Sequence, residues 1–173
     1  MKAFDFTTAK TARQRSSRSM SVKHGAAQMF DLVADVERYP EFVPLCLGAH
    51  VRHRAASAVG VETLIAEMRV GLGALTQSFT TRDTLDRSNL RITIVAVEGP
   101  FRHFENVWAF HPGVDANGCR MEFSADYEFS NPILAGVMAR MFELQFRKIA
   151  AAFEARADAI YGRGRTSIPD VRS

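Results

Sequence analysis

The sequence predicts an α+β fold in which a curved antiparallel sheet of six or seven strands wraps around one long C-terminal helix. Three observations predict it. Residues 47–129 alternate apolar and polar side chains with the period of two that is typical of strands. Turn sequences such as Gly99-Pro100 separate these segments, and no helical crossover for parallel pairing lies between them. Residues 132–160 instead repeat apolar residues at helical spacing.

Two short helices are expected between the first strand and the rest of the sheet. Residues 9–20 hold Thr, Ser and Arg without Gly or Pro and are interpreted as a strand. Ser21 is a candidate N-cap for a helix whose apolar residues recur at helical spacing. The segment DVERYPEFVPLC, at 35–46, is stiffened by Pro40 and Pro44 and is expected to form a second short helix or turn.

The C-terminal helix has clear limits. Pro132 suits the first helical position, and Gly162 ends the apolar repeat. Apolar residues in the first half spread over well above half of the circumference, whereas the second half carries a narrow stripe led by Phe153. The first half is therefore expected to be covered on more than one side. A sheet that grips such a helix and leaves room beside it is a helix-grip arrangement.

The chain is predicted to form one domain. Its 173 residues suffice for a substantial core. We expect a disordered segment at 1–8, the folded domain at 9–162 and a flexible basic tail at 163–173. The formal net charge of +3 arises from residues 1–23, with a net charge of +5, and residues 162–173, with +2, so the remaining body carries −4. Such ends could contact RNA or anionic lipid, although ordinary solvated termini are the favoured interpretation.

Motifs for chemistry are missing from the sequence. The five histidines lack metal-site spacing, and no GxSxG or similar nucleophile motif is present. Arg82 and Asp83 are interpreted as a surface pair, because exposed ion pairs are much commoner than inward ones. We therefore expect no metal site and no catalytic residue.

The cysteines and the N-terminus bear on the compartment. Cys46 and Cys119 lie far apart and form no CxxC pair, which favours a reduced, cytoplasmic environment. Peripheral contact with the inner membrane is an alternative. The first twenty residues lack the apolar core of a secretion signal, and a transit peptide is less favoured than a frayed end.

An excess of large apolar side chains indicates a ligand cavity between sheet and helix. Ordinary core packing is the alternative for each residue taken singly. Collectively, the seven methionines would suit an adjustable wall. The candidate ligand-binding residues are Tyr39, Phe42 and Leu72 at the mouth, and Met68, Val70, Phe79, Trp108, Phe123, Val137, Met138, Met141 and Phe142 along the walls.

The stiff segment around Tyr39 and Phe42 has two interpretations. Prolines lower the entropy cost of holding these side chains in place. They could therefore cap an elongated apolar ligand at the rim of the cavity. Equally, they could plug the end of the core.

Five phrases, in order, carry a family resemblance: DVERYPEFVPLC, SFTTRD, EGPFRHFENVWAFHP, DYEFSNPIL and AAFEARADAIYG. Together they resemble the coenzyme Q-binding protein family of the START-like (polyketide cyclase/dehydrase) superfamily, which includes the bacterial ribosome association toxin RatA. The resemblance covers about Ser21 to Gly162. One departure is Leu45, where many relatives have Trp.

The resemblance implies a helix-grip (START/Bet v 1-like) fold with a hydrophobic tunnel. It implies non-enzymatic binding of ubiquinone (coenzyme Q) or a related isoprenoid lipid, in support of respiration or quinone biosynthesis. Membrane or respiratory and quinone-synthesis proteins would then be partners. One alternative is a toxin-like protein that blocks ribosomal subunit joining, supported by the basic termini. A lesser alternative is a cyclase or aromatase, for which the sequence offers only Gln77, Arg82 and Asp83 as inward polar groups.

Overall fold

The computed structural model describes residues 13–71, 73–113 and 118–162, with backbone alone at 138–139 and 141–146. The predicted disordered segment 1–8 and basic tail 163–173 lie outside these residues. The predicted domain limits therefore stay predictions.

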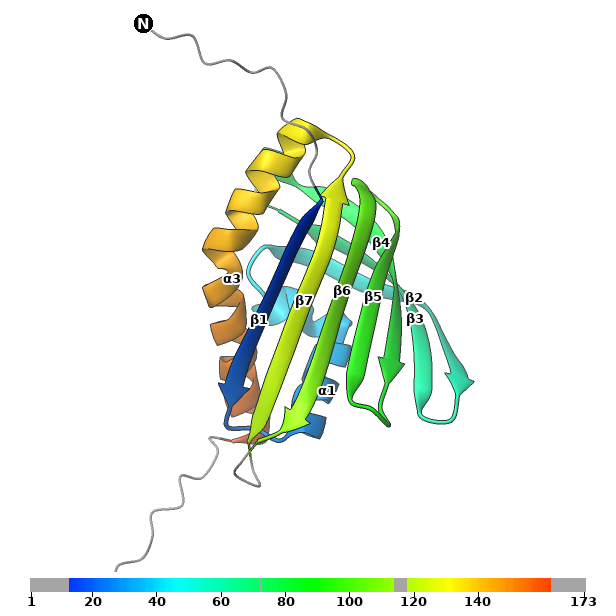
Figure 1. The fold of residues 1–173 in the computed structure, drawn as a ribbon, viewed down its shortest axis with the longest axis vertical. Helices are drawn as coiled ribbons and strands as arrows, with labels where there is room; N and C mark the ends of the chain where they lie inside the picture. Colours follow the sequence, from blue (N-terminus) through cyan, green and yellow to red (C-terminus); the bar gives the residue numbers. More distant parts are fainter. Residues whose placement is uncertain (1–12, 72, 114–117, 163–173) are drawn as a thin grey trace, which may run out of the picture.

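Seven antiparallel strands form one curved sheet, as the sequence predicts (Figure 1). Their spatial order is β1-β7-β6-β5-β4-β3-β2, so the N-terminal strand closes the sheet beside the last one. The six later strands follow one another as a meander, because short turns join antiparallel neighbours. The strands are β1 (Gln14–Val22), β2 (Cys46–Ala58), β3 (Val61–Val70), β4 (Gln77–Asp86), β5 (Arg91–Glu98), β6 (Phe101–Pro112) and β7 (Cys119–Phe129).

Short helical elements follow β1, as expected, but begin later than predicted. They are α1 (Ala26–Ala34), the 3-10 turn η1 (Val36–Arg38) and α2 (Tyr39–Phe42). Gly25, and not Ser21, is the N-cap of α1. Ser21 instead pairs with Arg120, because β1 remains hydrogen-bonded to β7 as far as Val22. Strand pairing, which is a tertiary contact, overrides the local capping preference of serine.

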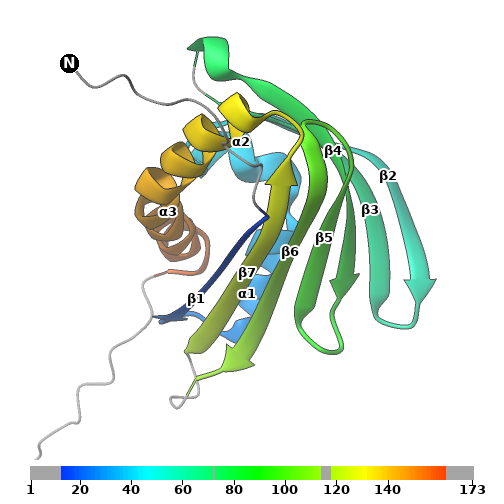
Figure 2. The same ribbon diagram turned by 45° about the horizontal axis from the view of Figure 1, so that its top comes forward.

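Helix α3 (Pro132–Tyr161) has the predicted limits. The Asn131 side chain accepts hydrogen bonds from the backbone N–H groups of Ile133 and Leu134, at 2.9 and 3.4 Å. Gly162 follows the last turn with φ of +79°, a conformation that favours glycine. Figures 1 and 2 show α3 on the concave side of the sheet, near the β1–β7 edge.

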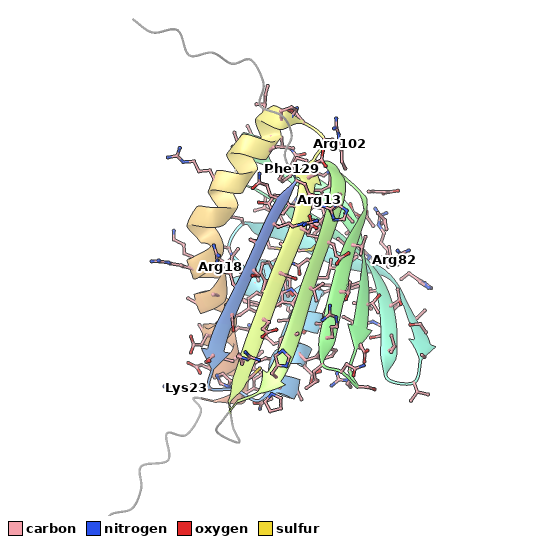
Figure 3. The ribbon with its side chains drawn as sticks, viewed as in Figure 1. Arg13, Arg18, Lys23, Arg82, Arg102 and Phe129 are labelled. Carbon is pink, nitrogen blue, oxygen red and sulfur yellow. The ribbon has the colours of Figure 1, made fainter. Side chains whose placement is uncertain are left out.

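The convex face of the sheet carries charges of both signs. Arg13 and Arg15 both contact Asp126, at 2.6 and 3.1 Å. Arg102, labelled in Figure 3, pairs with Glu128 at 3.5 Å, and Arg120 pairs with Glu122 at 3.3 Å. Charge is therefore interspersed over this face.

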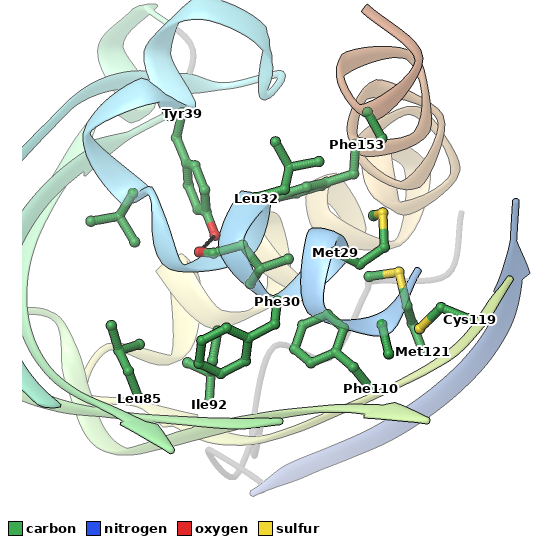
Figure 4. Close-up of a cluster of buried hydrophobic side chains, with 14 of the residues drawn as sticks. Met29, Phe30, Leu32, Tyr39, Leu85, Ile92, Phe110, Cys119, Met121 and Phe153 are labelled. Atoms are coloured by element: carbon green, nitrogen blue, oxygen red, sulfur yellow. Dashed lines mark hydrogen bonds between the residues drawn. The ribbon is translucent and has the colours of Figure 1, made fainter. Parts of the chain in front are cut away.

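A compact core fills one end of the concave face, beneath α1 (Figure 4). Phe30 of α1 is 1% exposed and meets Phe110 of β6 edge-on, with ring centroids 5.9 Å apart. Phe153 and Ala157 of α3 are 3% and 0% exposed. The second half of α3 is therefore fixed into the core. The buried strand residues here are Leu64, Leu85, Ile92, Phe110, Cys119 and Met121.

Shortening Phe153 tests this anchoring. Phe153→Ala should lower the free energy of unfolding by about 3–5 kcal/mol, since it removes a buried ring and leaves a cavity. Urea denaturation measures the change. Glu154→Ala, at the exposed neighbouring position, should stay within about 0.5 kcal/mol of the parent. A loss below about 1 kcal/mol for Phe153→Ala, on the same cavity scale, would contradict the assignment.

Candidate ligand-binding site

Alternate residues of each strand point to the concave face, beneath α3. Strand register aligns them in rows across the sheet. One row runs from Leu85 through Ile92 and Trp108 to Phe123. Cross-strand rows of this kind make the floor of any site between sheet and helix.

Burial along the concave face is uneven. At the α1 end, Leu85 and Ile92 are fully buried in the core. In the same row, and farther along the face, other apolar side chains are only half-buried, although they face the helix side of the sheet; of these, Met68, Ile94 and Trp108 pack against the core. These half-buried residues are Met68, Val70, Ile94, Ala96, Phe101, Phe104, Trp108, Phe123 and Tyr127. Apolar surface that stays accessible on this face is what an apolar ligand can cover.

An aromatic cluster forms the far end of this face. The Phe79 ring lies 5.5 Å from Phe101 and 6.1 Å from Phe104, and Phe101 lies 4.7 Å from Phe129, between centroids. Gly99 permits this packing, because its φ is +134° and a Cβ there would stand 2.4 Å from the Phe79 Cβ. The cluster is thus a built apolar wall. Phe79 and the half-buried Met68, which pairs with it across β3 and β4, were predicted wall residues.

A second aromatic cluster joins the sheet to the helices. Trp108 meets Phe123 at 4.7 Å and Phe153 of α3 at 5.9 Å, between ring centroids. Phe153 in turn meets Tyr39 at 5.4 Å and Phe42 at 5.2 Å. Four of the residues predicted for the site (Tyr39, Phe42, Trp108 and Phe123) are therefore connected through one ring of α3.

The two predicted mouth residues of α2 differ in burial. Tyr39 is 8% exposed, and its hydroxyl donates a 2.6 Å hydrogen bond to the Val33 carbonyl (Figure 4). Burial raises the pKa of this phenol well above its ordinary value, with a further rise from the nearby Asp83 carboxyl. Tyr39 therefore plugs the core, the second of its two interpretations. Phe42 is half-buried, with the Arg156 guanidinium 5.4 Å from its ring centroid.

The helix side of the predicted site is described only in part. Val137, a predicted wall residue, is 40% exposed, and Ile133 one turn earlier is 80% exposed. The side chains of Met138, Met141 and Phe142 lie outside the described residues, as does Leu72.

Polar side chains also lie on the concave face, which corrects the prediction for Asp83. Asp83 is 1% exposed, while Arg82 points to the exposed convex face, so the two do not form a surface pair. Asn106 is 7% exposed and was not predicted. The signal was present in the alternation: Asp83 shares its face with Thr81 and Leu85. Asn106 likewise alternates with aromatic residues of β6.

The two buried polar groups are incompletely satisfied. Asp83 Oδ1 and Asn106 Oδ1 have no hydrogen-bond partner among the described residues. Burial raises the pKa of Asp83 to about 6, and a hydrogen bond with the Thr81 side chain opposes part of that rise. A buried polar atom without a partner costs stability unless another molecule supplies one.

Two hollows on the described surface lie elsewhere. One, of about 460 Å³, separates α1 from the β2–β3 hairpin and contains the Arg87–Asp31 and Arg54–Glu62 pairs. The other, of about 320 Å³, lies over β1, β7, β6 and β5. Of the predicted site residues whose side chains are described, only Phe123 lines either hollow. The predicted tunnel therefore stays a prediction.

The described part of the chain holds no activated thiol and no cluster of metal ligands. Cys46 and Cys119 are buried free thiols, and burial raises the pKa of Cys119 to about 11. Its thiolate, the nucleophilic form, is therefore suppressed. Within residues 13–71, 73–113 and 118–162 no three His, Cys, Asp or Glu side chains gather as metal ligands. No helix in the same ranges is long and apolar enough to cross a membrane.

Comparison with known proteins identifies the family. The family model described as polyketide cyclase/dehydrase and lipid transport matches residues 22–154. The chain belongs to this family. The resemblance stated from sequence phrases is thus confirmed, and so is the START-like fold.

Named relatives fall into two groups. The ribosome association toxin RatA of Escherichia coli K12 is 35% identical over 145 residues, covering 84% of this chain and 87% of the toxin. The persistence and stress-resistance toxin PasT of an E. coli O6:H1 strain matches equally well. The mitochondrial coenzyme Q-binding protein COQ10 homolog B of Xenopus laevis is 30% identical over 139 residues, covering 79% of this chain and 54% of that protein.

Solved structures share the fold. An 18 kDa protein from Caulobacter crescentus superposes with a TM-score of 0.73 at 32% identity, covering 86% of this chain and 99% of that one. The Zhui aromatase/cyclase of Streptomyces sp. R1128 superposes with a TM-score of 0.72 at 16% identity, covering 88% and 99%. At that identity the second likeness concerns the fold alone.

The pH dependence of stability tests the burial of Asp83. Since its pKa rises from 3.8 to about 6 on folding, the folded state holds the proton more tightly. Wild-type stability should therefore fall as the pH rises from 4 to 7, by about 2 kcal/mol relative to Asp83→Asn. Urea unfolding of both proteins at several pH values measures the difference.

Asp86→Asn is the matched control on the same strand. Hydrogen bonds from Asn89 lower the pKa of Asp86, so the wild type should gain stability over this variant as the pH rises. A difference between wild type and Asp83→Asn that does not change with pH would contradict the burial of an ionisable carboxyl.

Proposed function

We propose that this protein binds ubiquinone, or a related isoprenoid quinone, between the concave face of its sheet and helix α3. The observation that carries the proposal is the band of half-buried apolar side chains on that face, including Met68, Phe104 and Trp108. Such a band, beside a core that is fully packed at its other end, suits an elongated apolar guest. The coenzyme Q-binding relative favours a quinone among such guests.

Hydrophobic burial supplies the affinity in this proposal. Each Å² of apolar surface removed from water stabilises the complex by about 25 cal/mol. An isoprenoid tail offers apolar surface only, so Val70, Phe79 and Phe123 suffice as contacts without a charged anchor. Phe42 and Val137, which are partly exposed, would border the entrance.

The proposed activity is binding without chemical conversion. The named relatives are a binding protein and toxins, whereas the aromatase/cyclase neighbours share only the fold. In this proposal the protein works in the cytoplasm and meets the inner membrane peripherally when it exchanges quinone, in support of respiration or quinone biosynthesis.

Quenching of Trp108 fluorescence tests quinone binding directly. Trp108 is the single tryptophan of the chain and lies on the concave face. Adding a short-tailed ubiquinone should quench the Trp108 emission saturably, because a quinone ring beside the indole accepts an electron from its excited state. Organic extracts of protein purified from its own cells should contain a quinone by mass spectrometry. Absence of both signals would overturn the proposal.

Filling the proposed site should abolish binding. Ala96 is half-buried on the concave face, so Ala96→Phe should occupy the guest's space and weaken ubiquinone binding at least about tenfold, at a cost in stability of about 1–3 kcal/mol. Val97→Phe is the control, because Val97 is 47% exposed and follows on the opposite face. Circular dichroism verifies folding. Equal affinities of the two variants would argue against the site.

Association with the ribosome is the second candidate function. The RatA relatives favour it, at 35% identity over most of both chains. We infer no particular interface for it, because the described convex face carries interspersed charges (Figure 3). In this alternative the protein would bind the large subunit and block subunit joining.

Sedimentation distinguishes the second candidate. Protein mixed with ribosomal subunits at low salt should co-migrate with the large subunit and reduce the 70S peak if this function is correct. Electrostatic contacts to RNA phosphates should weaken as salt increases. Free protein at the top of the gradient under all conditions would dismiss the candidate.

A further inference from the structure

Asp83 and Asn106 stand in one row across the concave face. Asp83 of β4 pairs with Ile94 of β5, and Ile94 pairs with Asn106 of β6. Leu64 and Ala125 continue the row on either side. The two polar side chains therefore flank one half-buried isoleucine, with apolar residues beyond them.

This row lies between the two aromatic clusters. Register places Phe104 and Thr81 on one side of it, toward the Phe79 cluster, and Trp108 and Leu85 on the other, toward the core. A guest that extends over the half-buried band must pass the row. Its polar side chains, although buried, are therefore those that a guest's head group would meet along this path.

Both groups present an acceptor oxygen that lacks a donor. Asp83 Oδ1 and Asn106 Oδ1 are each buried, and neither has a partner among the described residues. The Asp83 carboxyl remains mostly ionised at pH 7.5, since its pKa is about 6. An ionised carboxylate is an acceptor only. The terminal torsion of Asp and Asn side chains is broad, so both oxygens can adjust their direction to a donor.

We propose that this row recognises the reduced, dihydroxylated form of the quinone, a hydroquinone ring, in preference to the oxidised form. The inference rests on the proposed quinone-binding function and assigns its redox preference. A hydroquinone hydroxyl donates a hydrogen bond, whereas a quinone carbonyl only accepts one. An oxidised quinone would place its carbonyl oxygen beside Asp83 Oδ1, so two acceptors would face each other without a hydrogen-bond donor.

The spacing of the row fits two hydroxyls at opposite ends of one ring. Residues two strands apart in a row are separated by about 9.6 Å. The two acceptor oxygens that bind a para-dihydroxybenzene ring, each through a hydrogen bond of about 2.7 Å, lie a comparable distance apart. Ile94 then lies beneath the ring. A hydroxyl both donates and accepts, so it fits either amide orientation of Asn106.

Three probes that share one tail test the preference: 2-hexyl-1,4-hydroquinone, 2-hexyl-1,4-benzoquinone and the dimethyl ether of the hydroquinone. Affinities are measured anaerobically at pH 7.5 by isothermal titration calorimetry. The hydroquinone should bind at least about tenfold more tightly than the other two, the ratio expected for one hydrogen bond to a charged group. The dimethyl ether separates the effect of donors from that of ring size, since it cannot donate.

Variants assign the preference to the row. In Asn106→Leu and in Asp83→Asn the ratio of hydroquinone to ether affinity should fall several-fold, while ether affinity changes little. Glu105→Gln, on the neighbouring convex position of β6, should keep the wild-type ratio. Because the ratio is also measured in the wild type, loss of folding in one variant leaves the test intact.

The outcomes separate this inference from the proposed function. Equal affinity for all three probes would overturn the hydroquinone preference and leave quinone binding in place. Tighter binding of the benzoquinone would likewise overturn it. Failure of all three probes to bind would remove the proposed function itself.

Discussion

The structure depends on how one end of α3 is fixed to the sheet. The Phe153 ring contacts Tyr39, Phe42 and Trp108 at the same time, and Ala157 packs with no exposed surface. Tyr39 strengthens this junction with its hydrogen bond to Val33. The second half of α3, α1 and the part of the sheet beneath α1 therefore form one close-packed unit.

Fixing the helix at one end has a consequence for the rest of the concave face. Beyond the core, strands still present large apolar residues, such as Phe104 and Met68, but these keep accessible surface. In the first half of α3, Ile133 and Val137 are exposed. A folded protein normally minimises such surface, because its exposure opposes folding. A bound lipid that covers it would stabilise the folded state by mass action.

Polar groups at the border of the core give the face its chemical character. Asp83 and Asn106 are costly where they lie, since burial raises the pKa of one and leaves an oxygen of each unpaired. Apolar replacements of similar size would pack at lower cost. Their position, on one row between two aromatic clusters, is what the proposed head-group site requires, and it would distinguish that site from a purely apolar one.

Local sequence determined the strands, the limits of α3 and the family, because alternation, the Asn131 cap and the Gly162 end depend on neighbouring residues. Tertiary structure decided what those signals left open. Because β1 pairs with β7 as far as Val22, Ser21 lies in the sheet and does not cap α1, contrary to the prediction from the sequence. The alternation of side chains along β4 directs Asp83 to the buried concave face, although a charged residue beside an arginine is usually exposed. How deeply the side chains of the concave face are buried depends on where α3 is anchored, far away in the sequence. A short stretch of sequence does not encode the separation between that helix and the sheet.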